Sequence, residues 1–127
     1  MARKQTARQA AEAIREFAVG LPGAYEDFPW GERVVKVGKK VFVFMGKLDD
    51  ASGGMLSFGV KLPYSGAEAL ELPYVEPTGH GLGKSGWVTA QFEPDEHLPV
   101  DLVRGWVEES YRAVAPKKLV KELDARG

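Results

Sequence analysis

Apolar residues recur every three or four positions near the N-terminus. The stretch Ala10–Leu21 places alanine, isoleucine and phenylalanine side chains on one side, as in an amphipathic helix. Thr6 and Gln9 fit a capping box, in which a hydroxyl and a side-chain amide satisfy free backbone groups. Gly20 suits the end of a helix. The pattern therefore predicts a first helix in this segment.

A second helical pattern occupies the C-terminal part. Pro99 suits the first turn of a helix, and apolar residues then recur on one face up to Val114. Pro116 is expected to end this long helix, because proline lacks the N–H that a helix interior requires. Residues 117–123 are expected to form a final helical turn or two.

Between these helices, apolar and polar residues alternate, as in half-buried strands. Three such runs follow one another: Arg33–Val37, Lys40–Lys47 and Gly54–Lys61. Gly38 and Lys39 suit a two-residue hairpin turn with glycine first, and residues 48–53 suit a longer hairpin connection. Residues 21–31 hold two prolines and three aromatics. They are expected to form an ordered connection whose aromatics cover an edge of the core.

The next segment predicts a short helix and further extended structure. Ser65 and Glu68 fit a second capping box, and Pro73 ends the helix that they open. Three elements then follow: an extended piece at 74–76, a glycine-rich turn at 79–86 and a strand at Trp87–Phe92.

The element order is α-β-β-β-α-β-β-α, which predicts a two-layer α+β fold with an antiparallel sheet and the helices on one face. A chain of 127 residues has the usual length of one domain, so residues 1–127 are expected to form a single domain. No apolar run approaches the roughly 20 residues that span a bilayer, and no apolar signal segment follows the basic N-terminus. A cytoplasmic location without membrane contact is expected.

The hairpin turn sets the register of the first two strands. Three pairs are expected to lie opposite one another: Val37 and Lys40, Val35 and Phe42, and Arg33 and Phe44. The core face is then expected to carry Val35, Val37, Phe42, Phe44, Leu56, Phe58 and Val60. The opposite face is expected to carry Lys36 with Val34, Val41, Val43 and Met45. Either a protein partner or a second copy of the chain covers this valine-rich face, or the register is off by one residue.

The charge of the chain is balanced but unevenly distributed. Its net charge is −1, whereas a nucleic-acid-binding domain is usually basic. Residues 33–47 nevertheless carry five basic residues and no acid, while residues 66–77 carry three acids and no base. The fold is therefore expected to have a basic region and an acidic side.

The sequence motifs that resemble catalytic, cofactor or metal sites each lack a feature that such a site requires. Residues 81–86 match G-x-G-x-x-G, but a predicted strand follows where a phosphate-binding loop needs a helix N-terminus. The chain has two histidines and no cysteine, which are fewer nitrogen and sulfur ligands than a structural zinc site uses. Ser110 falls on the buried side of the last helix, where a backbone-bonded hydroxyl is commoner than a nucleophile. No enzymatic activity, cofactor or metal is expected.

Six lysines at strand ends and hairpins form the candidate binding set: Lys36, Lys39, Lys40, Lys47, Lys61 and Lys84. Lysines at hairpin tips can reach the phosphates of a nucleic acid. Lysines at strand edges also prevent unwanted strand pairing. Spacing alone leaves both interpretations open.

An ordered set of short motifs resembles the MmcQ/YjbR-like family over roughly residues 8–123. The motifs are Leu21–Gly23, Pro29–Gly31, Val35–Phe42, Val60–Lys61, Gly83–Val88 and Ser110–Tyr111. The resemblance implies the α-β-β-β-α-β-β-α fold and a likeness to double-wing DNA-binding proteins. It points to Lys36, Lys40, Lys61, Lys84 and Trp87 as the matching positions.

The resulting hypothesis is a weak, largely sequence-nonspecific DNA-binding protein whose lysine-edged hairpins contact the DNA. The alternative is a non-enzymatic interaction module or homodimer that uses the apolar residues of the second sheet face, Val34, Val41, Val43 and Met45.

Overall fold

Six strands form one sheet in the order β1-β2-β3-β4-β6-β5, and every neighbouring pair is antiparallel. The computed structural model describes residues 7–29, 32–47, 56–79, 82–93 and 96–126. The strands are β1 (Ala24–Asp27), β2 (Glu32–Val37), β3 (Lys40–Lys47), β4 (Leu56–Lys61), β5 (Val75–Pro77) and β6 (Trp87–Phe92). The predicted cap residue Thr6 and the predicted loop at 48–53 lie outside the described residues.

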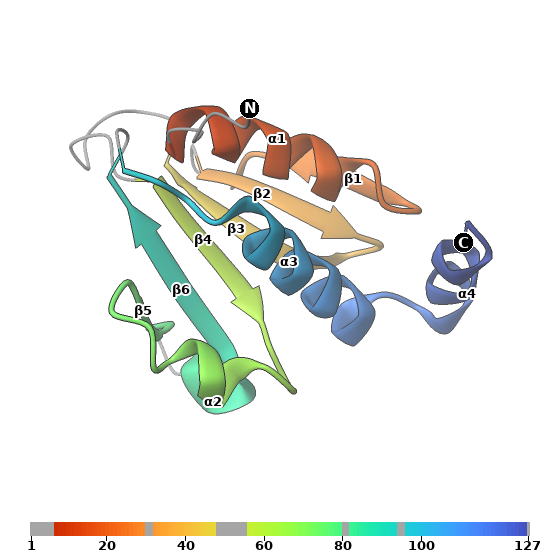
Figure 1. Ribbon diagram of the computed structural model, residues 1–127. Coiled ribbons are helices and arrows are strands. Elements are labelled where there is room, and N and C mark those ends of the chain that lie inside the picture. Colours follow the sequence, from red (N-terminus) through yellow and green to blue (C-terminus); the bar gives the residue numbers. More distant parts are fainter. Residues whose placement is uncertain (1–6, 30–31, 48–55, 80–81, 94–95, 127) are drawn as a thin grey trace.

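Two long helices cover one face of this sheet (Figure 1). They are α1 (Ala7–Val19) and α3 (Val100–Val114). Three shorter helices lie elsewhere: α2 (Gly66–Ala69), the 3-10 helix η3 (Leu82–Ser85) and α4 (Lys117–Ala125). The predicted two-layer α+β fold, with its antiparallel sheet and helices on one face, is therefore confirmed, as is a final helical segment after Pro116.

One strand was not predicted. Residues 21–31 were expected to be a connection, but Ala24–Asp27 within them forms β1, which pairs with β2 so that Tyr25 lies opposite Lys36. This four-residue strand holds one aromatic and two acidic residues, a composition that gives little strand signal by itself. Its partner β2 supplies the hydrogen bonds, and the Tyr25 hydroxyl donates to the Gly38 carbonyl oxygen at 2.5 Å.

The predicted register of the β2–β3 hairpin is correct at the turn and wrong beyond it. Val37 lies opposite Lys40 as expected, and Gly38 has a positive φ of 63°. The register then shifts, because Phe42 is an extra residue in β3, and Val35 lies opposite Val43 rather than Phe42. Such a bulge places two successive side chains on the same side of the strand. Both Phe42 and Val43 belong to the buried core.

The bulge exchanges the faces of the rest of β3. Phe44, expected in the core, lies opposite Val34 instead of Arg33 and contacts Trp87 on the other face. Val43, expected on the second face, is fully buried in the core, and Met45 packs against the core. The predicted assignment of these residues to faces is therefore wrong, because strict alternation does not hold across a bulge.

The second face of the sheet carries a small aromatic cluster rather than a valine surface. The Phe44 and Trp87 rings meet edge to face, with their centroids 5.3 Å apart. Gly59, opposite Phe44 on β4, leaves room for them: a Cβ there would lie 3.3 Å from the Phe44 Cβ. Val34 is fully buried. Of the four residues predicted for this surface, Val34 and Val43 are fully buried and Met45 packs against the core, so the four do not form one exposed patch.

The buried Ser110 hydroxyl joins α3 to the sheet at the bulge. It donates to the Phe42 carbonyl oxygen at 2.6 Å and accepts from the Lys61 amide at 2.9 Å. The paired residues of β3 and β4 end at Val43 and Val60. The hydroxyl therefore satisfies two backbone groups at the point where these strands separate, and it has the backbone-bonded role expected for it.

We predict that Ser110→Ala lowers the free energy of unfolding by about 1–3 kcal/mol, because it leaves a buried carbonyl and an amide without partners. Urea denaturation measures the change. The control is Ser85→Ala on η3, whose serine is exposed and should matter by less than about 0.5 kcal/mol. Equal stabilities of the two variants would contradict the bridging role.

Candidate nucleic-acid interface

The sheet topology brings five of the six predicted lysines toward one end of the sheet. Lys39 lies in the β2–β3 turn and Lys40 begins β3. Lys61 ends β4 opposite the first residue of β6, and Lys84 lies just before β6 in η3. Lys36 lies one residue before the end of β2. We call the part formed by Lys39, Lys40, Lys61 and Lys84 the lysine end.

Lys47 lies at the other end of the sheet. It is the last residue of β3, opposite Glu32 at the start of β2. The predicted set of six therefore does not form one site, because the two ends of an eight-residue strand are about 23 Å apart.

The lysine end offers cations without carboxylate partners. Lys39, Lys40 and Lys84 are exposed, and Lys61 is half-buried. Within the described part of the chain, no carboxylate oxygen lies within salt-bridge distance of any of these four ammonium groups. Unpaired ammonium groups can bind phosphates without first losing a partner.

Lys36 differs from these four because it is already paired. Its ammonium lies 2.8 Å from a carboxylate oxygen of Asp27 on β1. The hydrogen bond from Lys36 lowers the pKa of Asp27, and the backbone N–H of Phe28 lowers that pKa further. The same hydrogen bond raises the pKa of Lys36. Lys36 is therefore the least available of the predicted set for an external anion.

Helix α4 adds positive charge to the same end. Leu119 packs where Gly23, just before β1, has no side chain, and the Arg126 guanidinium donates to the Gly20 carbonyl oxygen at 2.8 Å. The start of β1 pairs with the end of β2, next to the lysine turn. α4 carries three exposed lysines: Lys117, Lys118 and Lys121. Spacing along the strands could not reveal them, because only the packing of α4 brings them to this end.

A groove runs between the loop after β4 and the outer side of α3. It has a volume of about 630 Å³. Its lining comprises Lys61, Pro63, Tyr64, Gly105, Glu108, Glu109, Arg112 and Ala113. The Arg112 guanidinium closes one side, where it pairs with Glu108 at 3.3 Å and with Asp124 of α4 at 2.9 Å.

Glu109 fixes the loop that carries Tyr64. One carboxylate oxygen accepts from the backbone N–H groups of Tyr64 and Ser65 at 2.9 and 3.0 Å, and the other accepts from the Ser65 hydroxyl at 2.6 Å. Ser65 begins α2 without a side-chain cap bond of its own, so the predicted capping box with Glu68 is wrong. Tyr64 was not among the predicted site residues, because the contact that holds its backbone comes from a distant helix.

The described residues provide no site for metal binding or for stacking on Trp87. Across the described ranges, no group of three histidine, aspartate or glutamate side chains is placed to hold a metal ion. His97 is exposed, and His80 lies outside the described residues. Trp87, carried over from the family resemblance, is nearly buried against Phe44, so its ring is not free to stack on a ligand. No helix in the described segments combines the length and apolarity of a membrane span.

The chain is similar to proteins of one known family. The YjbR family model matches residues 19–113. This chain belongs to the YjbR family. The crystal structure of Deinococcus radiodurans protein DR2400, with the family domain DUF419, is similar at 27% identity and a TM-score of 0.69. The similarity covers 94% of this chain and 91% of that protein. The search of curated proteins found no match.

The family match spans the sheet and the lysine end. All four lysines of this end lie within residues 19–113, as does Tyr64. The lysines of α4 lie beyond the matched range. The comparison supports the YjbR fold for the region that carries the candidate interface.

We predict that Lys36→Met raises the pKa of Asp27 toward the ordinary value of an aspartate, because the variant removes the hydrogen bond that stabilises the charged form. An NMR pH titration of the carboxyl carbons measures it. With its lowered pKa, Asp27 stabilises the fold above the ordinary aspartate pKa, and this contribution disappears as the pH falls through the folded-state pKa. Lys36→Met should reduce that pH dependence.

The internal control for this titration is Glu12, whose pKa is lowered by its hydrogen bond with Arg15 on α1. That carboxyl should titrate identically in both proteins. An unchanged Asp27 titration in the variant would show that Lys36 is free in solution.

Proposed function

We propose that this protein binds DNA weakly and with little sequence preference through the lysine end of its sheet. The observation that carries the proposal is that Lys39, Lys40, Lys61 and Lys84 lie at one end of the sheet, on a turn, two strand ends and η3. None of them is paired with a carboxylate among the described residues. Contacts of this kind neutralise backbone phosphates and fix the position of the DNA without selecting a base sequence.

The cations furthest from the acidic residues are those of the β2–β3 turn and of α4. The acidic stretch 66–77 forms α2 and β5, which follow Lys61 and border η3, where Pro77 lies against Gly83 and pairs with Val88. β5 and β1 are the two opposite edges of the sheet, so these acids lie apart from the β2–β3 turn and from the exposed lysines of α4 beside it. A net charge of −1 does not prevent binding, because charges more than about 10 Å apart are largely screened at 0.1 M salt. The local basic surface then determines the affinity for phosphates.

The geometry favours backbone contacts over base recognition. The long helices α1 and α3 pack on the sheet, and the lysines lie on turns and strand ends. Sequence-specific recognition places a helix or a two-stranded ribbon in the major groove with side chains hydrogen-bonded to base edges. Lysine-bearing turns alone supply point charges, which suit phosphates.

We predict that Lys40→Ala weakens DNA binding several-fold and lowers its salt dependence, whereas Lys47→Ala does not. These residues begin and end the same strand, so the pair tests the lysine end against an equal loss of charge elsewhere. Four phosphate contacts give a slope of log affinity against log salt of about −3 to −4, and each lost contact reduces it by about 0.9.

Fluorescence anisotropy of a labelled duplex between about 50 and 200 mM salt measures these slopes. Circular dichroism should show both variants folded, since Lys40 is exposed. Absence of binding to the duplex and to its separated single strand at about 50 mM salt would refute DNA binding altogether. Equal losses in the two variants would refute the assignment to this end of the sheet.

A further inference from the structure

An exposed glycine lies in the middle of α3 without a packing reason. Gly105 is six residues into a 15-residue helix, and a Cβ built on it meets nothing within 4 Å. Glycine in a helix interior lowers helix stability relative to alanine, chiefly through backbone entropy. No neighbour within the described chain requires this residue to be small. Gly105 also lines the groove beside Tyr64, which suggests that something outside the chain approaches the helix there.

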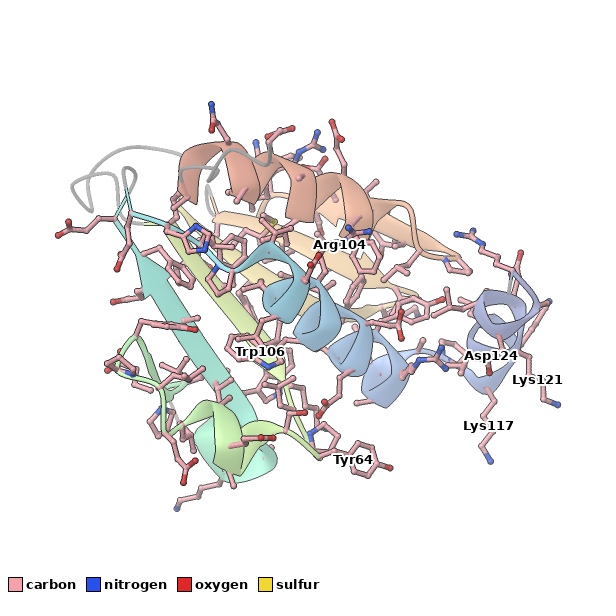
Figure 2. All side chains as sticks on the ribbon, in the orientation of Figure 1. Tyr64, Arg104, Trp106, Lys117, Lys121 and Asp124 are labelled. Atoms are coloured by element: carbon pink, nitrogen blue, oxygen red, sulfur yellow. The ribbon has the colours of Figure 1, made fainter. Side chains whose placement is uncertain are left out.

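Across the groove, a tyrosine has an exposed side chain on a backbone that is held in place. Tyr64 is 90% exposed, the largest exposure among the large apolar and aromatic residues of the described ranges. Its backbone N–H is held by Glu109, and the next residue is held by the same carboxylate through two further bonds. Figure 2 shows the ring projecting from the loop into solvent. A solvent-facing ring on an anchored backbone offers a surface for stacking.

We propose that this groove binds an unpaired nucleobase of single-stranded DNA, stacked on Tyr64 and lying over Gly105. The proposal rests on DNA binding by the lysine end and specifies the form of DNA that is bound. Aromatic side chains next to a basic surface are the usual means of holding a single strand without sequence preference. In a duplex the bases are stacked on one another and cannot reach the Tyr64 ring.

The size of the groove fits a base with part of its sugar. Its volume of about 630 Å³ lies within the range of about 300–1,000 Å³ that is usual for small-molecule sites. Along α3, Gly105 and Arg112 are about 10 Å apart, from the rise of 1.5 Å per residue. The part of α3 that forms the floor of the groove, from Gly105 to Arg112, is therefore long enough for a flat ring system. It ends at a charged residue.

The charges around the groove orient the nucleotide. The carboxylates of Glu108 and Glu109 disfavour phosphate on the floor, while Lys61 at the wall has a flexible four-carbon stem that lets its ammonium reach a phosphate at the rim. Figure 2 shows the side chains of Lys117 and Lys121 at the same end of the molecule as Tyr64. The base therefore points inward and the backbone outward, toward the cations.

The test compares one labelled oligonucleotide as a single strand and as a duplex, by fluorescence anisotropy at equal salt. The wild-type protein should bind the single strand about tenfold more tightly, and Tyr64→Ala should abolish that preference, because one base–aromatic stack contributes about 5-fold to 100-fold in affinity. Tyr64→Phe should keep it. The matched control is Phe28→Ala, whose half-exposed ring follows β1 at the opposite end of the sheet.

A second variant separates binding from folding. Gly105→Leu should raise the melting temperature by a few degrees, since leucine favours the helix, and should weaken single-strand binding about tenfold by filling the groove. Higher stability together with lost binding cannot result from misfolding.

The outcomes distinguish the two proposals. Equal binding of both DNA forms, or unchanged single-strand affinity in Tyr64→Ala or Gly105→Leu, would overturn the stacking site while leaving the lysine end supported, provided that Lys40→Ala still reduces the salt dependence. Failure to bind either form at about 50 mM salt would overturn both.

Discussion

The bond network around the Ser110 hydroxyl is the constraint on which the arrangement of this fold depends. Phe42 is an extra residue in β3, and β3 and β4 separate beside it. Two backbone groups would be buried without partners there if the hydroxyl did not join both strands to α3. The bulge can therefore persist within the core, where Phe42 packs edge to face against Tyr111. The separated strand ends carry Lys40 and Lys61.

The candidate interface follows from these strand ends rather than from any local motif. Antiparallel pairing brings the β2–β3 turn, the end of β4 and the start of β6 to the same end of the sheet. Helix α3 contributes twice: Glu109 fixes the loop of Tyr64, and Arg112 connects the groove to α4 through Asp124. One helix thus positions both the lysine-bearing strand end and the groove beside it.

Much of the fold could be predicted from the sequence, whereas the details of the site could not. Gly38 defined the turn, so the pair of Val37 and Lys40 was correct. The bulge could not be predicted from the sequence. Phe42 and Val43 are both apolar, so the pattern fits a core position for either residue. Because β1 was not predicted, the pairing of Lys36 with Asp27, which lies on that strand, was not predicted either. The backbone of Tyr64 is held by a residue 45 positions away along the chain, a contact that no local pattern contains.

The two edge strands of the sheet limit how copies of this protein can associate. β1 has four residues and carries two acids, and β5 has three residues and ends in Pro77. Short, charged or proline-bearing edges are poor templates for adding a further strand. Association by sheet extension, the route to many aggregates and domain-swapped assemblies, is thereby disfavoured at both borders. The protein can keep an exposed basic end at high concentration without its sheets joining side to side.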